Sequence, residues 1–152
     1  MHVFVKEDRV LFWELCDHNA NDKEVQRVAS WAVDYLPEGD TLIWDRLGRS
    51  GRARNPVKQH YNPRVHRWFR KAGVSVEFLP PKGKYFNPLE LLFGDLKAHY
   101  IEPAYPGDGT HMTKQQLHAI IENYMEQHAP TALPGFFRMR ASGRYAREHE
   151  LL

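Results

Sequence analysis

Apolar residues recur along this chain in patterns that predict strands and helices in a regular order. Residues 2–6 and 9–16 are rich in β-prone side chains on either side of a short polar turn, which predicts two strands. From 22 to 36 the apolar residues recur at helical spacing, with Asp22 as the expected N-cap. After a proline and a glycine, residues 41–44 form a short apolar run that predicts a third strand.

The second half of the chain begins with a predicted loop and continues with helices and one strand. Residues 46–61 contain two glycines, a proline and many arginines, and a loop of this length inside a domain is usually functional. The Asn-Pro pairs at 62–63 and 87–88 each predict an N-cap followed by proline at the first helical position. They open two helices, with a strand at 74–79 between them. A capping box that starts at Thr113 opens a further amphipathic helix.

The order of these elements predicts the fold class. Strand, strand, helix, strand, helix, strand, helix, helix is typical of an α/β protein. Its later strand–helix–strand units imply parallel strands with right-handed crossovers. Residues 1–133 are expected to form one domain, and residues 134–152 a basic C-terminal tail. The sequence shows no internal repeat.

Composition narrows the class of protein further. The 152 residues, 42% apolar and 26% charged, have the balance of an ordinary globular domain. No apolar run approaches the length of a membrane span, and the N-terminus does not resemble a secretory signal. We therefore expect no membrane partner and an intracellular location. The one cysteine, Cys16, rules out a disulfide framework, fits a reducing compartment and is expected to be a buried apolar residue.

The charge is unevenly distributed although the net charge is only +2. Between Asp45 and Glu77 there is no acidic residue, yet this stretch holds nine of the chain's 21 basic residues. Such an asymmetry indicates a polyanionic partner. A solvated basic loop is the alternative, and the charge pattern alone does not separate the two.

Two carboxylates lie where catalytic groups are often found. Asp45 follows the strand at 41–44, and the carboxyl ends of strands in open α/β sheets are where ligands bind. Glu90 falls on the first turn of the helix after the next strand. If the fold brings them together, they require a cation, and Mg²⁺ prefers such oxygen ligands. Each also has a simpler interpretation: Asp45 as a turn residue, and Glu90 as a capping-box acid three residues after Asn87.

The stretch Val76 to Lys97, VEFLPPKGKYFNPLELLFGDLK, resembles the signature of the Tc1/mariner and IS630-type transposases. In that family an apolar strand leads to Leu-Pro-Pro, a short loop, Asn-Pro-Ile-Glu, a tryptophan and Leu-Lys. The matching residues are Leu79, Pro80, Pro81, Asn87, Pro88, Leu89, Glu90, Leu96 and Lys97. The resemblance covers roughly residues 10–130. It implies a ribonuclease-H-like mixed sheet with flanking helices.

The resemblance also implies an activity and a site. Glu90 falls on the family's third catalytic acid, and Asp45, at the end of the segment from Leu42, falls on the second. Both would bind Mg²⁺ or Mn²⁺ for DNA cleavage and strand transfer at transposon ends, in the nucleus of a eukaryote or the cytoplasm of a bacterium. The residues expected to contact the DNA backbone are Arg49, Arg52, Arg54, Lys58, Lys82 and Lys84.

Four departures from the family pattern surround the two acids. Arg46 stands where the family usually has asparagine. The histidine that normally follows is displaced, with His60 as the nearest candidate, so the separation of the acids is longer than usual. Phe93 replaces the usual tryptophan, and the charged loop Lys82-Gly83-Lys84 replaces a neutral turn.

The largest departure concerns the first catalytic aspartate. It belongs on a central strand upstream of a β-hairpin, and this chain is expected to begin at that hairpin. Glu7 or Asp8 could replace it, but only 37 residues separate Asp8 from Asp45 (45 − 8), and the fold needs a further strand there. Glu14 is a further candidate.

This departure leaves two other functions open. One is a catalytically inactive, domesticated or truncated nucleic-acid-binding or assembly protein. In such a protein a second copy or a partner chain would complete the sheet. The other is a generic metal-dependent nuclease.

Overall fold

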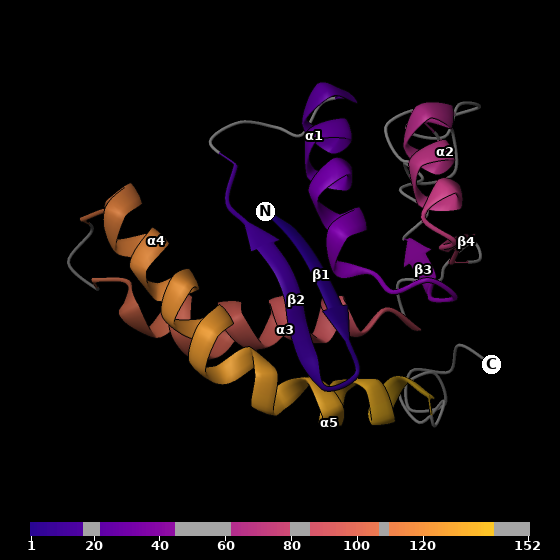
Figure 1. The fold of residues 1–152 in the computed structure, drawn as a ribbon. Coiled ribbons are helices and arrows are strands. Elements are labelled where there is room, and N and C mark those ends of the chain that lie inside the picture. The colour runs from indigo at the N-terminus through magenta and orange to yellow at the C-terminus, as the bar shows by residue number, and fades with distance from the viewer. Residues whose placement is uncertain (17–21, 45–61, 80–85, 107–109, 142–152) are drawn as a thin grey trace, which may run out of the picture. The chain divides into compact units, whose positions relative to one another are not determined.

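The computed structural model describes residues 1–16, 22–44, 62–79, 86–106 and 110–141 (Figure 1). The chain groups into two compact units. Unit 1 comprises Met1–His2 and Cys16–Lys84, and unit 2 comprises Val3–Leu15 and Tyr85–Leu152. Helices and short sheets together confirm the α/β class in its general form. None of the helices in the described ranges combines the length and apolar character needed to span a lipid bilayer.

The described part of unit 1 contains two α-helices and a two-stranded parallel sheet. Helix α1 spans Asp22–Ala32 and ends in a 3-10 turn, η1, at Val33–Tyr35. The chain continues through strand β3 (Thr41–Trp44), helix α2 (Pro63–Lys71) and strand β4 (Ser75–Phe78). Strands β3 and β4 pair in parallel, with Thr41 opposite Ser75 at one end and Trp44 opposite Phe78 at the other. The parallel pairing predicted from the strand–helix–strand order is therefore confirmed.

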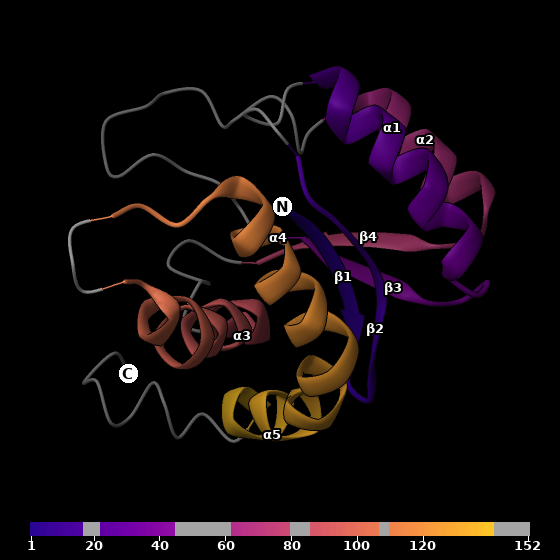
Figure 2. The same ribbon diagram turned by 90° about the vertical axis from the view of Figure 1, so that its left-hand side faces the viewer.

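Side chains alternate between the two faces of this sheet. Trp44 and Phe78 are half-buried on the face that meets α2. The Trp44 ring packs edge-to-face on the Phe69 ring of α2, with 6.2 Å between the ring centroids. Helix α1 lies beside α2 (Figure 2), and together they form the core of the unit. The buried residues there are Val25, Val28, Ala29, Ala32, Val65, Phe69 and Val74. The opposite face is open, and Ile43 on it is 64% exposed.

The described part of unit 2 contains a β-hairpin and three α-helices. Strands β1 (His2–Lys6) and β2 (Arg9–Glu14) form the hairpin. Helix α3 (Pro88–Leu96) continues as a π-helical turn, η3 (Lys97–Ile101), and a 3-10 turn, η4 (Glu102–Ala104). Helix α4 (Lys114–Asn123) is joined to α5 (Ala129–Ala141) by a second π-helical turn, η5 (Tyr124–His128). In Figure 2 the three α-helices lie on the same side of the hairpin.

The core of unit 2 lies between these helices and the hairpin. Its buried residues are Leu92, Leu96, Ile121, Tyr124, Met125, Ala129 and Leu133. The half-buried hairpin residues Val3, Val5, Val10, Trp13 and Leu15 pack against them. Every residue of β1, and every residue of β2 except Arg9, is at least half-buried.

Two features differ from the sequence-based picture. Helix α5 runs through Pro134, the position where a separate tail was expected to begin. Proline inside a helix costs about 3 kcal/mol, but continuing the helix buries Leu133 fully and packs Phe136 and Phe137 on the core. The described strands also form two separate two-stranded sheets rather than one mixed sheet. A ribonuclease-H-like sheet therefore remains a prediction.

Candidate functional site

Glu90 occupies the first turn of α3, as the sequence predicts. The side-chain oxygen of Asn87 accepts a hydrogen bond from the Leu89 N–H at 3.0 Å, and Pro88 takes the first helical position. Glu90 itself is exposed. A carboxylate at this position interacts favourably with the positive end of the helix dipole.

The interpretation of Glu90 as a capping-box acid can be compared with a true capping box in the same unit. At the start of α4 the Thr113 hydroxyl accepts from the Gln116 N–H at 3.2 Å, and the Thr113 N–H donates to the Gln116 side chain at 2.9 Å. At the start of α3 only the side chain of Asn87 caps the helix. Within the described residues, the Glu90 carboxylate makes no hydrogen bond or ion pair. It is therefore not used as a cap.

The other predicted site residues fall outside the described residues. These are Asp45, Arg49, Arg52, Arg54, Lys58, Lys82 and Lys84. Asp45 directly follows Trp44, the last residue of β3, in the sequence. A pairing of Asp45 with Glu90 thus remains a proposal drawn from the sequence.

The candidates for a first catalytic acid occupy ordinary positions. Glu7 and Asp8 are exposed in the turn between β1 and β2, and the Asp8 carboxylate lies 3.8 Å from the Arg9 guanidinium. Glu14 is half-buried at the end of β2. The ion pair between Asp8 and Arg9 lies at the surface, where such pairs contribute little to the free energy of unfolding. Within the described residues, neither Glu7 nor Asp8 lies in a group of side chains that could hold a metal ion.

The sequence did not predict a polar network in unit 2 that runs from the buried Tyr124 to the exposed His99. The Tyr124 hydroxyl donates to one carboxylate oxygen of Asp95 at 2.8 Å and lies 3.2 Å from the Leu92 carbonyl oxygen. The other carboxylate oxygen of Asp95 lies 2.9 Å from Nδ1 of His99. Burial, and then the hydrogen bond that the hydroxyl donates to the Asp95 carboxylate, raise the pKa of Tyr124 well above its ordinary value near 10. In the sequence, the separation of Asp95 and His99 by one helical turn could have indicated the hydrogen bond between these two residues.

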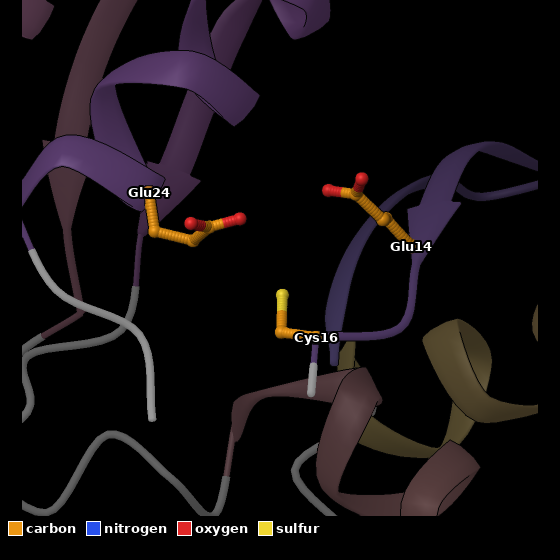
Figure 3. Close-up of side chains that lie close together, drawn as sticks. All are labelled: Glu14, Cys16 and Glu24. Atoms are coloured by element: carbon orange, nitrogen blue, oxygen red, sulfur yellow. The ribbon is translucent and has the colours of Figure 1, made fainter. Parts of the chain in front are cut away.

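Figure 3 shows three side chains with atoms of the kinds that bind metals. Cys16 and Glu24 belong to unit 1, and Glu14 belongs to unit 2. All three are half-buried, so Cys16 is less buried than the sequence predicts. Because the group divides between the two units, it is not a site of either one, and no function is based on it.

Comparisons with known proteins do not assign a family. Neither the models of known protein families, nor the curated proteins, nor the solved structures gave a match to this chain. The transposase resemblance therefore rests on the residues of the chain itself.

Proposed function

We propose that this chain is a DDE-type, ribonuclease-H-like domain related to the Tc1/mariner and IS630-type transposases. Its reaction would be Mg²⁺- or Mn²⁺-dependent cleavage and strand transfer of DNA. The observation that carries the proposal is the placement of Glu90. It projects from the first turn of α3, directly after the Asn87 cap and Pro88, with its carboxylate left unused by the cap. The parallel β3–α2–β4 unit precedes it in the order that the family motif implies.

The residues present suit the proposed metal by their chemistry. Asp45 and Glu90 both offer carboxylate oxygens, the ligands that Mg²⁺ prefers. When bound, Mg²⁺ would neutralise charge on the phosphodiester and lower the pKa of a coordinated water. The two acids would hold the ion, and the basic residues of the 46–58 and 82–84 segments would hold the DNA backbone. Such a domain would act in the nucleus of a eukaryote or the cytoplasm of a bacterium.

A plasmid assay tests the catalytic proposal. Purified protein is incubated with supercoiled plasmid and Mg²⁺ or Mn²⁺, and nicked and strand-transfer products are separated on a gel. We expect Asp45→Asn and Glu90→Gln each to reduce product by a hundredfold or more, since each removes a metal ligand. Glu122→Gln, which alters an exposed acid on α4, is the matched control and should leave activity unchanged. Nicking without strand transfer would support the generic nuclease instead.

The second candidate function is a non-catalytic nucleic-acid-binding or assembly protein. Two observations support this second function. The described strands form two separate pairs, and the acids Glu7 and Asp8 lie in an exposed turn. In this form a second copy or a partner chain would add the strand that completes a sheet. DNA binding that survives Asp45→Asn and Glu90→Gln, with no cleavage by the wild type, would support this function over the first.

A further inference from the structure

A pocket of about 400 Å³ lies within unit 1, where α2 runs beside β4. Its walls come from two elements that are contiguous in the sequence. His66 and Arg70, one helical turn apart on α2, form one side. The backbone and side chains from Gly73 to Glu77 form the other. Three consecutive residues of β4, from Ser75 to Glu77, therefore line the pocket.

Among the described residues, one edge of β4 pairs with β3 and the other edge has no neighbouring strand. The Ser75 N–H donates to the Asp40 carbonyl oxygen at 3.0 Å, and the Leu79 N–H donates to the Trp44 carbonyl oxygen at 2.9 Å. In a parallel ladder every second residue faces the same neighbour, so Val76 directs its N–H and C=O to the opposite edge. No strand pairs along that edge within the part of the chain that the structure describes. Val76, which lines the pocket, thus offers a donor and an acceptor.

The two faces of β4 carry opposite charge at this edge. On the α2 face the His66 ring stacks on Phe78 at 5.5 Å, and the exposed Arg70 lies one turn further along the helix. Helix α2 contains no acidic residue. On the open face of the strand Glu77 is exposed. A ligand running along this edge would meet the Arg70 guanidinium and the His66 ring on one face and the Glu77 carboxylate on the other.

We propose that the outer edge of β4 binds an extended peptide by strand addition. Its backbone would pair with Val76, and its alternate side chains would fall on opposite faces of the lengthened sheet. An acidic side chain of the peptide would meet His66 and Arg70, and the adjacent basic side chain would meet Glu77. This mixed charge favours a peptide over a nucleic acid, because a polyanion would be repelled by Glu77. The proposal does not depend on the nuclease function.

The first test uses a synthetic peptide, acetyl-Val-Thr-Glu-Lys-Val-Thr-amide, and amide NMR spectra of the full chain. We expect the peptide to shift the Val76 amide signal, and Arg70→Ala to weaken binding by up to about fivefold through loss of one exposed charge pair. Arg67→Ala changes a residue of the same type on the same helix that does not line the pocket. It should leave the affinity unchanged. Equal effects of Arg67→Ala and Arg70→Ala would overturn the proposal.

The second test separates strand pairing from simple charge attraction. A peptide of the same sequence, N-methylated at alternate residues on its pairing edge, keeps every charge but loses backbone donors. Strand addition predicts loss of binding, whereas unchanged affinity would contradict it. The Arg70→Glu variant should bind a peptide with lysine in place of glutamate better than the original peptide, which shows that the variant is folded. A short DNA duplex that shifts Val76 when the peptides do not would also overturn the proposal.

Discussion

Asp95 accepts two hydrogen bonds at the surface of the unit 2 core, and its two partners differ in exposure. Tyr124 is fully buried, while the His99 side chain is 70% exposed. A buried tyrosine hydroxyl costs free energy unless it is paired, so Asp95 makes the burial of Tyr124 tolerable. Because Asp95 lies on α3 and Tyr124 begins η5, the pair fixes these two elements against each other.

The first prediction concerns the free energy of unfolding. Tyr124→Phe should lower it by about 1–2 kcal/mol, because the ring is kept while the hydrogen bond to a carboxylate is lost. Urea unfolding monitored by circular dichroism measures this change. Tyr100→Phe is the control, since the Tyr100 ring packs on the Tyr124 ring at 4.8 Å. Its hydroxyl forms no hydrogen bond within the described residues. Equal losses for the two variants would argue against the assigned role of Asp95.

The second prediction follows from the raised pKa of Tyr124. Above pH 10, its ordinary value, the unfolded chain releases the phenolic proton while the folded chain keeps it. The folded state then binds more protons than the unfolded state, so stability falls as pH rises above 10, by about 1.4 kcal/mol per pH unit from this group. Below pH 10 the group adds no slope. Urea midpoints measured from pH 9 to 11 should therefore decline less steeply for Tyr124→Phe than for the wild type.

At the scale of elements, the join between α2 and β4 depends on one glycine. Gly73 has φ = +73°, a conformation in which a Cβ atom is strained, and a methyl group there would also press on the Glu38 side chain. This residue lets the chain reverse immediately after α2, so that Val74 is buried and Ser75 begins β4.

The third prediction compares two glycines. Gly73→Ala should lower the free energy of unfolding by about 1–2 kcal/mol through the left-handed backbone conformation. Gly94→Ala should instead raise it by about 0.5–1 kcal/mol, because Gly94 lies inside helix α3 and its missing Cβ faces open space. Thermal unfolding of both variants measures the difference. Changes of the same sign would show that the turn after α2 is not held as the structure indicates.

The elements were largely predictable because their signals are local. The Asn62 and Asn87 caps and the Thr113 capping box depend on residues within one turn of each other, and the structure confirms all three. The π-helical turn at Tyr124 and the passage of α5 through Pro134 were not predictable in this way. Both depend on burying side chains against distant parts of the chain, which no short window of sequence reveals.

The candidate site was predictable to a smaller extent. The exposure of Glu90 follows from its place in the first turn of a capped helix, which the sequence states directly. The Tyr124–Asp95 hydrogen bond joins residues 29 positions apart, so no spacing rule indicates it. The opposite charges on the two faces of β4 likewise depend on which way the strand turns toward α2, as the stacking of His66 on Phe78 shows.

At the scale of the whole molecule, the uneven charge is partly displayed on a described element. Helix α2 carries Arg64, Arg67 and Lys71, all exposed and none of them lining the pocket beside β4, and it contains no acidic residue. Positive charge is therefore concentrated on α2 although the net charge of the chain is only +2. Such a surface attracts phosphate backbones by releasing their counterions, a contribution that depends on salt and not on base sequence.

The last prediction tests whether this concentration of charge binds DNA. The double variant Arg64→Gln and Arg67→Gln should bind a short labelled duplex more weakly than the wild type. Because each lost phosphate contact lowers the dependence of log K on log salt by about 0.9, the slope between roughly 50 and 200 mM salt should fall by about 2. Fluorescence anisotropy measures it. Lys114→Gln with Arg138→Gln removes the same charge from exposed positions on α4 and α5. If both double variants lose the same affinity and slope, the net charge rather than α2 governs binding.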